Sequence, residues 1–168
     1  MIDAAKTKRS APRPHAACTC GSLRKASRRV SQFYDTALAP LGIKSTQFSI
    51  LAEVERGSAL GSISMCKLAA AMVMDRSTLG HNLRPLQRDA LLILRTSSED
   101  RRKRYVELTL EGRTLLRQAR RHWRRAEKRF EKIFGRKPAA DLRAVLLNIA
   151  NNTDLKLRVP SGARHVDR

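Results

Sequence analysis

Residues 74–88 constrain the fold most, because their spacing of apolar and basic residues predicts a short helix with two different faces. Leu79, Leu83 and Leu86 lie at steps of four and three residues, so they would form one apolar stripe. Asp75 can cap this helix, because its carboxylate can accept hydrogen bonds from the free amides of the first turn. The opposite face carries residues that can donate to phosphates and base edges: Arg76, Ser77, His81, Arg84 and Arg88. Alone, the pattern fits either an ordinary amphipathic helix with solvated arginines or a helix that reads DNA.

The flanking segments favour the second interpretation. Ser64 can cap a short preceding helix, after an extended piece around Ile63, and the buried face of that helix should consist of Met65, Leu68, Ala69 and Met72. Residues 91–97 and 104–110 are strand-like, and the polar tip between them has three consecutive basic residues after Asp100. Two short helices joined by a tight turn and followed by a β-hairpin predict a winged helix-turn-helix.

Amphipathic helices are expected on both sides of this lobe. A helix that starts at Ser45 or Thr46 and ends at Gly57 should bury Phe48, Leu51 and Ala52. Before it, residues 23–41 have an apolar seam at helical spacing, with Tyr34 and Leu38 beside it, made of Leu23, Ala26, Val30, Phe33, Ala37 and Leu41. Residues 111–134 have a heptad seam, made of Leu116, Ala119, Trp123, Ala126, Phe130 and Ile133. A last helix offers Leu142, Val145, Leu146 and Ile149.

The terminal seams are most simply explained as a dimerisation region, although they could instead pack only on their own domain. The expected fold is therefore mainly α with a small β-hairpin wing: a winged helix-turn-helix lobe plus terminal dimerisation helices. We divide the chain into a disordered basic tail (1–17), an N-terminal dimerisation helix (18–44), the DNA-binding lobe (45–110), the long helix with a C-terminal dimerisation helix (111–152), and a second basic tail (153–168).

The charge of the chain indicates a polyanionic partner. A formal net charge of +20 and a pI near 11.3 favour nucleic acid first and an anionic membrane surface second. Aromatic residues make up only 4%, which argues against modules that stack RNA or single-stranded bases on exposed rings. No apolar run approaches the ~20 residues of a transmembrane helix, and the N-terminus lacks the apolar core of a secretory signal. We expect a soluble, cytoplasmic protein with no membrane partner.

The candidate DNA contacts fall into two groups. On the helix they are Arg76, Ser77, Thr78, His81 and Arg84, and on the wing they are Asp100, Arg101, Arg102 and Lys103. On the wing, an Asp two residues before an Arg suggests that the Asp100 carboxylate holds the guanidinium of Arg102 in a defined pose, and the pair resembles a wing motif in which this arginine is directed towards a minor groove. The alternative for the wing is a solvated charged turn.

The three cysteines are too few and odd in number for a disulfide framework. Cys18 and Cys20 should lie at the start of the first helix, near Arg24 and Lys25, where the surroundings favour the reactive thiolate. They are redox candidates, with an intersubunit disulfide favoured over a strained local one, although both thiols could be incidental. Cys66 is expected to be a small buried hydrophobe.

We find no sequence pattern for catalysis or for a bound metal. His15, Cys18 and Cys20 form an H-x2-C-x-C pattern, but a zinc site needs a fourth ligand and usually a wider spacing. No set of nucleophile and base has usable spacing. We therefore expect no enzyme, no metal and no cofactor.

Three segments resemble the MarR family of bacterial transcriptional regulators: KSTQFSIL (44–51), KLAAAMVMDRSTLGHNLRPLQRDALL (67–92) and DRRKRYVELTLEGRTLL (100–116). The resemblance runs from about residue 23 to residue 150. It implies a triangular homodimer whose terminal helices interlock while two winged lobes bind successive major grooves of a pseudo-palindromic operator in double-stranded DNA. Such proteins usually repress transcription. Many release DNA when a phenolic or other lipophilic anion binds between the lobe and the dimer helices, and a subset respond to cysteine oxidation.

The chain departs from the family pattern at three positions. His81 stands where we expect an arginine, and a histidine is a weaker phosphate contact because it titrates near neutrality. Ala90 replaces the usual glycine after the helix, so a left-handed turn there would be strained. Pro85 removes a hydrogen bond to the carbonyl of His81, so the helix should bend or fray at its far end. The alternative function is that of a non-specific nucleoid-associated or RNA-binding basic protein.

Overall fold

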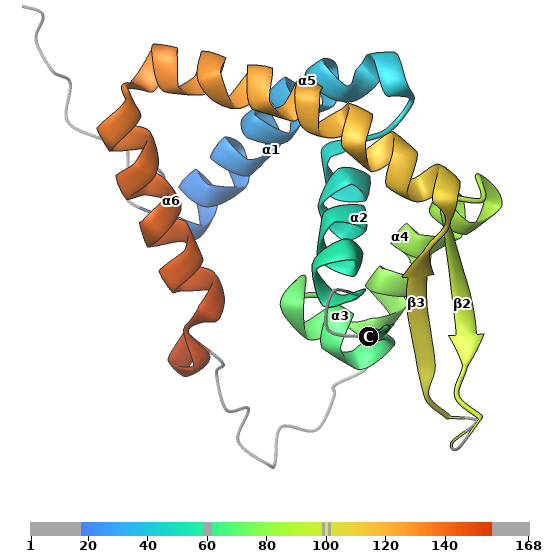
Figure 1. Cartoon of the computed structure of the whole chain (residues 1–168). Coiled ribbons are helices and arrows are strands. Elements are labelled where there is room, and N and C mark those ends of the chain that lie inside the picture. The colour runs from blue at the N-terminus through green and yellow to red at the C-terminus, as the bar shows by residue number, and fades with distance from the viewer. Residues whose placement is uncertain (1–17, 59–61, 99, 101, 156–168) are drawn as a thin grey trace, which may run out of the picture.

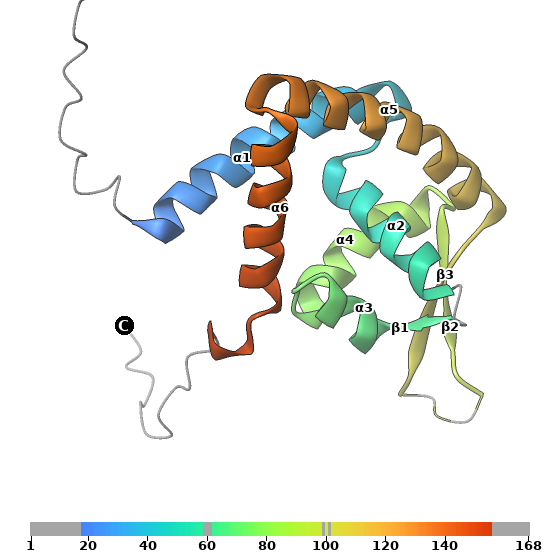
Figure 2. The ribbon, with the colours of Figure 1, turned by 60° about the vertical axis from the view of Figure 1, so that its left-hand side comes forward.

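The computed structural model of the chain describes residues 18–58, 62–98, 100 and 102–155. Figure 1, with Figure 2 for β1, shows the elements, which are in chain order α1 (Thr19–Leu38), α2 (Ser45–Ser58), β1 (Ile63–Ser64), α3 (Met65–Ala71), α4 (Arg76–Arg88), β2 (Leu92–Thr96), β3 (Arg104–Leu108), α5 (Leu110–Phe134) and α6 (Arg136–Asn151). Short 3₁₀ turns at Ala39–Leu41 and Thr153–Leu155 follow α1 and α6. The predicted mainly α fold with a β-hairpin wing is confirmed.

The wing is the edge of a three-stranded antiparallel sheet in the order β1-β3-β2. The β2–β3 hairpin pairs from Leu92 opposite Leu108 to Thr96 opposite Arg104. The extended piece expected around Ile63 is the third strand, because Ile63 pairs with Val106 of β3. The sheet thereby ties the start of α3 to the wing.

Leucines of α4 form the centre of the lobe. Leu79, Leu83 and Leu86 are 0%, 1% and 0% exposed, which confirms the predicted stripe. In α3, Leu68 and Ala69 are buried as predicted, whereas Met65 and Met72 are only partly buried. The opposite face of α4 therefore points away from the core.

The buried face of α2 is wider than one stripe. Phe48 and Leu51 are buried as expected, but Ile50 and Val54 are also fully buried and Ala52 is only partly so. The reason is that α2 packs on the sheet, on α4 and on α5 at once, so several of its sides face apolar neighbours.

Helix α1 begins at Thr19, near the start of the predicted segment 18–44, but its buried side is displaced from the predicted seam. Tyr34 and Leu38 are the buried residues, whereas Val30 of the seam is 36% exposed. Stacking explains this arrangement, because Trp123 of α5 lies between Tyr34, at 4.2 Å between ring centroids, and Phe48 of α2, at 4.4 Å.

The passage from the wing to α5 is a close backbone junction. The hydroxyl of Thr109 donates to the Ala90 carbonyl at 2.7 Å and accepts from the amide of Gly112 at 3.0 Å. The amide of Thr109 also donates to the Leu91 carbonyl at 3.2 Å. A Cβ on Gly112 would lie 1.9 Å from that same carbonyl oxygen, so only glycine fits here. Ala90 has a φ of 52°, so the turn after α4 is left-handed and is strained, as expected for a residue with a Cβ in that conformation.

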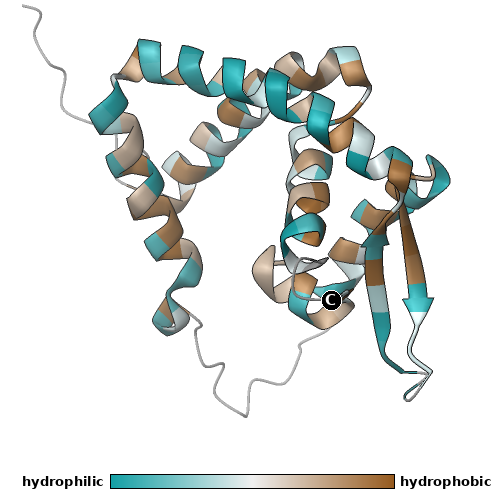
Figure 3. Cartoon of the chain, viewed as in Figure 1, coloured by the Kyte–Doolittle hydropathy of each residue, from teal (hydrophilic) through white to brown (hydrophobic). Residues whose placement is uncertain are grey.

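Helix α6 descends from the far end of α5 and stands apart from the lobe (Figures 1 and 2). Only Ala139 of this helix is buried. Five of its large apolar side chains are exposed: Leu142, Val145, Leu146, Leu147 and Ile149. In Figure 3 the ribbon of α6 accordingly carries hydrophobic segments along its length. None of the helices in the described ranges is long and apolar enough to cross a membrane.

Candidate nucleic-acid interface

Asp75 starts α4 as predicted. One carboxylate oxygen accepts from the amide of Thr78 at 2.7 Å, and the other accepts from the Thr78 hydroxyl at 2.7 Å. The backbone hydrogen bond from Thr78, followed by its hydroxyl hydrogen bond, lowers the pKa of the Asp75 carboxyl below its ordinary value. Because its hydroxyl proton is used in the cap, Thr78 can offer only its oxygen to another partner.

The other predicted helix contacts lie on the outer face of α4. Arg76, Ser77, His81 and Arg84 are exposed. Arg88 is exposed too, but its Nε donates to the Asp89 carboxylate at 3.0 Å, which partly satisfies its charge. The helix continues through Pro85 to Arg88, so the predicted fraying does not occur.

The wing turn is ordered by a different bond from the one predicted. The Asp100 carboxylate accepts from the backbone amide of Arg102 at 3.0 Å, in the manner of an Asx turn, and not from its guanidinium. The amide of Lys103 donates to the Asp100 carbonyl at 2.8 Å, which closes the turn, and Lys103 Nζ lies 3.9 Å from its carboxylate. Asp100 therefore shapes the tip, while Arg102 extends from it. The predicted contact Arg101 lies outside the described residues.

A basic hollow lies between the start of α3, the start of α4 and the wing. Its volume is about 630 Å³. Five of its lining residues are basic and none is acidic: Lys67, Arg76, Arg102, Lys103 and Arg104. Sequence reasoning missed Lys67 and Arg104. Strand alternation places Arg104 on the same face of β3 as buried Val106, so it gave no signal that Arg104 is exposed at the start of the strand.

The prediction that Cys66 is buried is wrong, because the residue is exposed. On a helix, Cys66 lies roughly 200° around the axis from buried Leu68, so it faces away from the core. Its Sγ is 2.6 Å from Nη2 of Arg76, within the basic hollow.

Cys18 and Cys20 lie at the start of α1, as predicted, and both are exposed. Cys18 is the N-cap residue, and its Sγ accepts from the amide of Gly21 at 3.4 Å. His15, the third member of the H-x2-C-x-C pattern, lies outside the described residues. Within the described ranges, no group of three or more His, Cys, Asp and Glu residues could hold a metal ion.

A second cavity, here called the lobe-side cavity, lies where the terminal helices face the lobe. Its volume is about 390 Å³, and its lining combines Tyr34, Trp123, Phe130, Leu142 and Arg143 of the terminal helices with Thr46, Met72 and Met74 of the lobe. The Tyr34 hydroxyl donates to Glu127 at 2.7 Å, and Arg143 donates to the same carboxylate at 3.1 Å. Burial, and then the hydrogen bond to Glu127, raise the pKa of Tyr34 well above its ordinary value, so this hydroxyl stays protonated.

The fold and the exposed basic helix define a winged helix-turn-helix protein, and comparison with known proteins assigns its family. No family model and no curated protein matches the chain. Among solved structures, the chain is similar to the M. tuberculosis transcriptional regulator MosR in complex with DNA, with 32% identity over 83% of this chain and 99% of that one, at a TM-score of 0.73.

Two further structures are similar. The transcriptional repressor CouR of Rhodococcus jostii RHA1, bound to a DNA duplex, is 26% identical over 79% of this chain and 92% of that one, at a TM-score of 0.70. A MarR-family regulator from Rhodococcus sp. RHA1 shares the fold at 22% identity, over 79% of this chain and 91% of that one, at a TM-score of 0.69. The chain belongs to the MarR family of transcriptional regulators.

Proposed function

We propose that the protein is a homodimeric repressor that binds a pseudo-palindromic operator in double-stranded DNA. The observation that carries the proposal is the outer face of α4, where Arg76, Ser77 and Arg84 are exposed above fully buried leucines. Arginine on a rigid helix is suited to bidentate bonds with guanine in a major groove. MosR, which is 32% identical to this chain, was crystallised with DNA.

The wing and the basic hollow would bind the DNA backbone. Arg102 extends from a turn that Asp100 orders, so its guanidinium can reach a minor groove while the turn keeps its shape. Lys67 and Arg104 line the hollow between the wing and α4, where a phosphate would meet positive charge alone. The proposed DNA-binding lobe is residues 45–110.

Residues 18–44 and 111–152 would form the dimerisation region. The exposed apolar side chains of α6, from 38% exposed at Ile149 to 61% at Leu147, need a covering surface. At the far end of α5, Ile133 and Phe134 are 61% and 57% exposed and extend this surface. A second copy of the chain would cover this surface, and it would also place two DNA-binding lobes on successive half-sites.

Two inputs could control DNA binding. The lobe-side cavity is bounded by both the dimer helices and the lobe, so a lipophilic ligand there would change the angle between them. Oxidation of Cys18 or Cys20, both exposed at the start of α1, would act on the dimer region. CouR, one of the similar proteins, has been crystallised with p-coumaroyl-CoA.

We further propose that the protein acts in the cytoplasm, where its DNA lies, and that it is not an enzyme. The competing function is that of a basic protein that binds nucleic acid without sequence preference, which a net charge of +20 alone would permit. The β2–β3 wing and the amphipathic α4 favour sequence-specific DNA binding.

Footprinting of the DNA upstream of the protein's own gene, in excess competitor DNA and at a fixed salt concentration, separates the two functions. A specific dimer protects two related half-sites at competitor levels that remove charge-only binding. Uniform protection, or none that survives the competitor, would contradict the proposal.

A further inference from the structure

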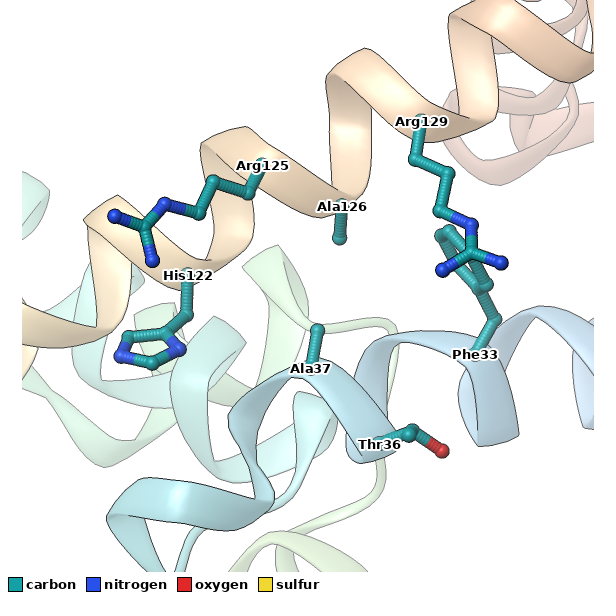
Figure 4. A pocket seen from close by; sticks show the side chains of 7 residues that line it. All are labelled: Phe33, Thr36, Ala37, His122, Arg125, Ala126 and Arg129. Atoms are coloured by element: carbon teal, nitrogen blue, oxygen red, sulfur yellow. The ribbon is translucent and has the colours of Figure 1, made fainter.

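A third cavity lies between α1 and α5, and we call it the α1–α5 hollow. Its volume is about 390 Å³, within the usual range for small-molecule sites, and it is lined by Phe33, Thr36, Ala37, His122, Arg125, Ala126 and Arg129. Figure 4 shows Ala37 and Ala126 pointing toward one another across its centre, with His122 and Arg125 at one end and Phe33 and Arg129 at the other. The floor is therefore apolar and the rim is basic.

The basic side chains on this rim have no counter-charge. Among the described residues, neither Arg125 nor Arg129 has a hydrogen-bond or ion-pair partner, and no acidic residue lines the hollow. The acidic residues in this part of α5 serve other contacts. Glu127 binds Tyr34 and Arg143, and Glu131 also binds Arg143. The charges of α5 are thus separated, with its carboxylates turned towards α6 and its guanidinium groups left over the hollow.

Leaving these arginines unpaired weakens the helix. Arg121, Arg125 and Arg129 follow one another at steps of four residues, and like charges at this spacing repel on a helix. An anion seated at the rim would remove that repulsion and accept hydrogen bonds from the guanidinium groups. Its remaining atoms would rest on Phe33 and the two alanines, where an aromatic or aliphatic body is favoured over water.

We propose that the α1–α5 hollow binds a small amphipathic organic anion, with its acidic group held by Arg125 and Arg129 and its apolar part on the floor. This site is separate from the lobe-side cavity, and the two share no lining residue. It lies entirely between two helices of the proposed dimer region, so it does not depend on contact with the DNA-binding lobe. The inference goes beyond the proposed function and does not require it.

The test is calorimetric titration of the full-length protein with naphthalene-1-sulfonate and with its neutral analogue naphthalene-1-sulfonamide. The wild type should bind the sulfonate about tenfold or more tightly than the sulfonamide, because a bond from a guanidinium to an anion is the stronger one. Arg125→Gln/Arg129→Gln should lose this preference. Arg124→Gln/Lys128→Gln removes the same charge from exposed positions of the same helix that do not line the hollow, and it should bind like the wild type.

Two further measurements locate the bound probe. The histidine side-chain NMR signals, assigned with His122→Gln, should show a shift of His122 on titration and none of His81, which lies on α4. Ala37→Phe, which fills the hollow without changing charge, should also abolish sulfonate binding in a variant whose circular dichroism matches the wild type. The two Gln double variants lose the same charge, so they should bind operator DNA equally. The outcome of the probe titration is therefore independent of the outcome of the footprinting experiment.

Three outcomes would overturn the proposal. They are equal affinity for the sulfonate and the sulfonamide, equal loss in the two Gln pairs, and a bound probe that leaves His122 unshifted. Absence of sulfonate binding to the dimer at millimolar concentration would also overturn it and would indicate that a second copy of the chain covers the hollow.

Discussion

Replacement of Gly112 by alanine should destabilise the protein, although alanine is the better helix former. In an open helical position the change would add about 0.5–1 kcal/mol of stability, because glycine loses more backbone entropy on folding. At Gly112, however, the new Cβ would lie 1.9 Å from the Leu91 carbonyl oxygen and 2.9 Å from its carbon. Both are backbone atoms, and the same carbonyl accepts from the Thr109 amide at 3.2 Å, so relief requires movement of the junction. Overpacking of this kind costs about 1–3 kcal/mol or more, which outweighs the gain in helix propensity.

Gly80 provides the matched control, because it also lies within a helix and a Cβ there meets nothing within 4 Å. Thermal unfolding at one fixed protein concentration measures both variants, since a dimer's midpoint depends on concentration. For a chain of this size, 1 kcal/mol shifts Tm by about 2–4 °C. Gly80→Ala should raise Tm by a few degrees, and Gly112→Ala should lower it by about 4 °C or more. A rise in Tm for Gly112→Ala equal to that of Gly80→Ala would refute the steric argument.

Three further predictions concern individual residues. Arg84→Ala should weaken operator binding by about 1–3 kcal/mol in gel retardation and leave binding to random DNA nearly unchanged, and equal losses on both DNAs would contradict its base-reading role. Mild peroxide should release operator DNA and form an intersubunit disulfide on non-reducing gels, and the Cys18→Ser/Cys20→Ser variant should not respond. A response that persists there and disappears in Cys66→Ser would move the redox site to the basic hollow. Val73→Gly should raise the free energy of unfolding by about 1 kcal/mol in urea titration, because Val73 has a φ of 51° and glycine adopts that conformation without strain; no gain would contradict this.

Local patterns predicted the lobe well, because its elements are short and bury one face. The stripe on α4, the Asp75 cap and the Ser64 cap of α3 depend on residues within one or two turns, and each is present. The burial of α2 and α1 depends on which elements surround them. Val54 of α2 and Tyr34 of α1 are buried by partners distant in sequence, which helical periodicity alone cannot identify.

The errors at the candidate site have physical causes of the same kind. Cys66 was expected inside because free cysteine is usually buried, but its angular position on α3 turns it towards Arg76. The Asp100 carboxylate was expected to pair with the guanidinium of Arg102. The backbone amide of Arg102, two residues further on, is closer to this carboxylate and donates to it instead. Lys67 and Arg104 were missed because they meet only when β1 pairs with β3, which brings the start of α3 beside the wing.

Selection of binding sites from random double-stranded DNA, with the full-length protein at a fixed salt concentration, tests the central claim most directly. A dimer that reads DNA with the exposed face of α4 should enrich an inverted repeat whose half-site centres lie about one helical turn, ~34–36 Å, or a multiple of it, apart. Arg84→Ala should relax the sequence preference within each half-site without changing this spacing. Enrichment of no motif, or of a single half-site without its inverted partner, would contradict the account.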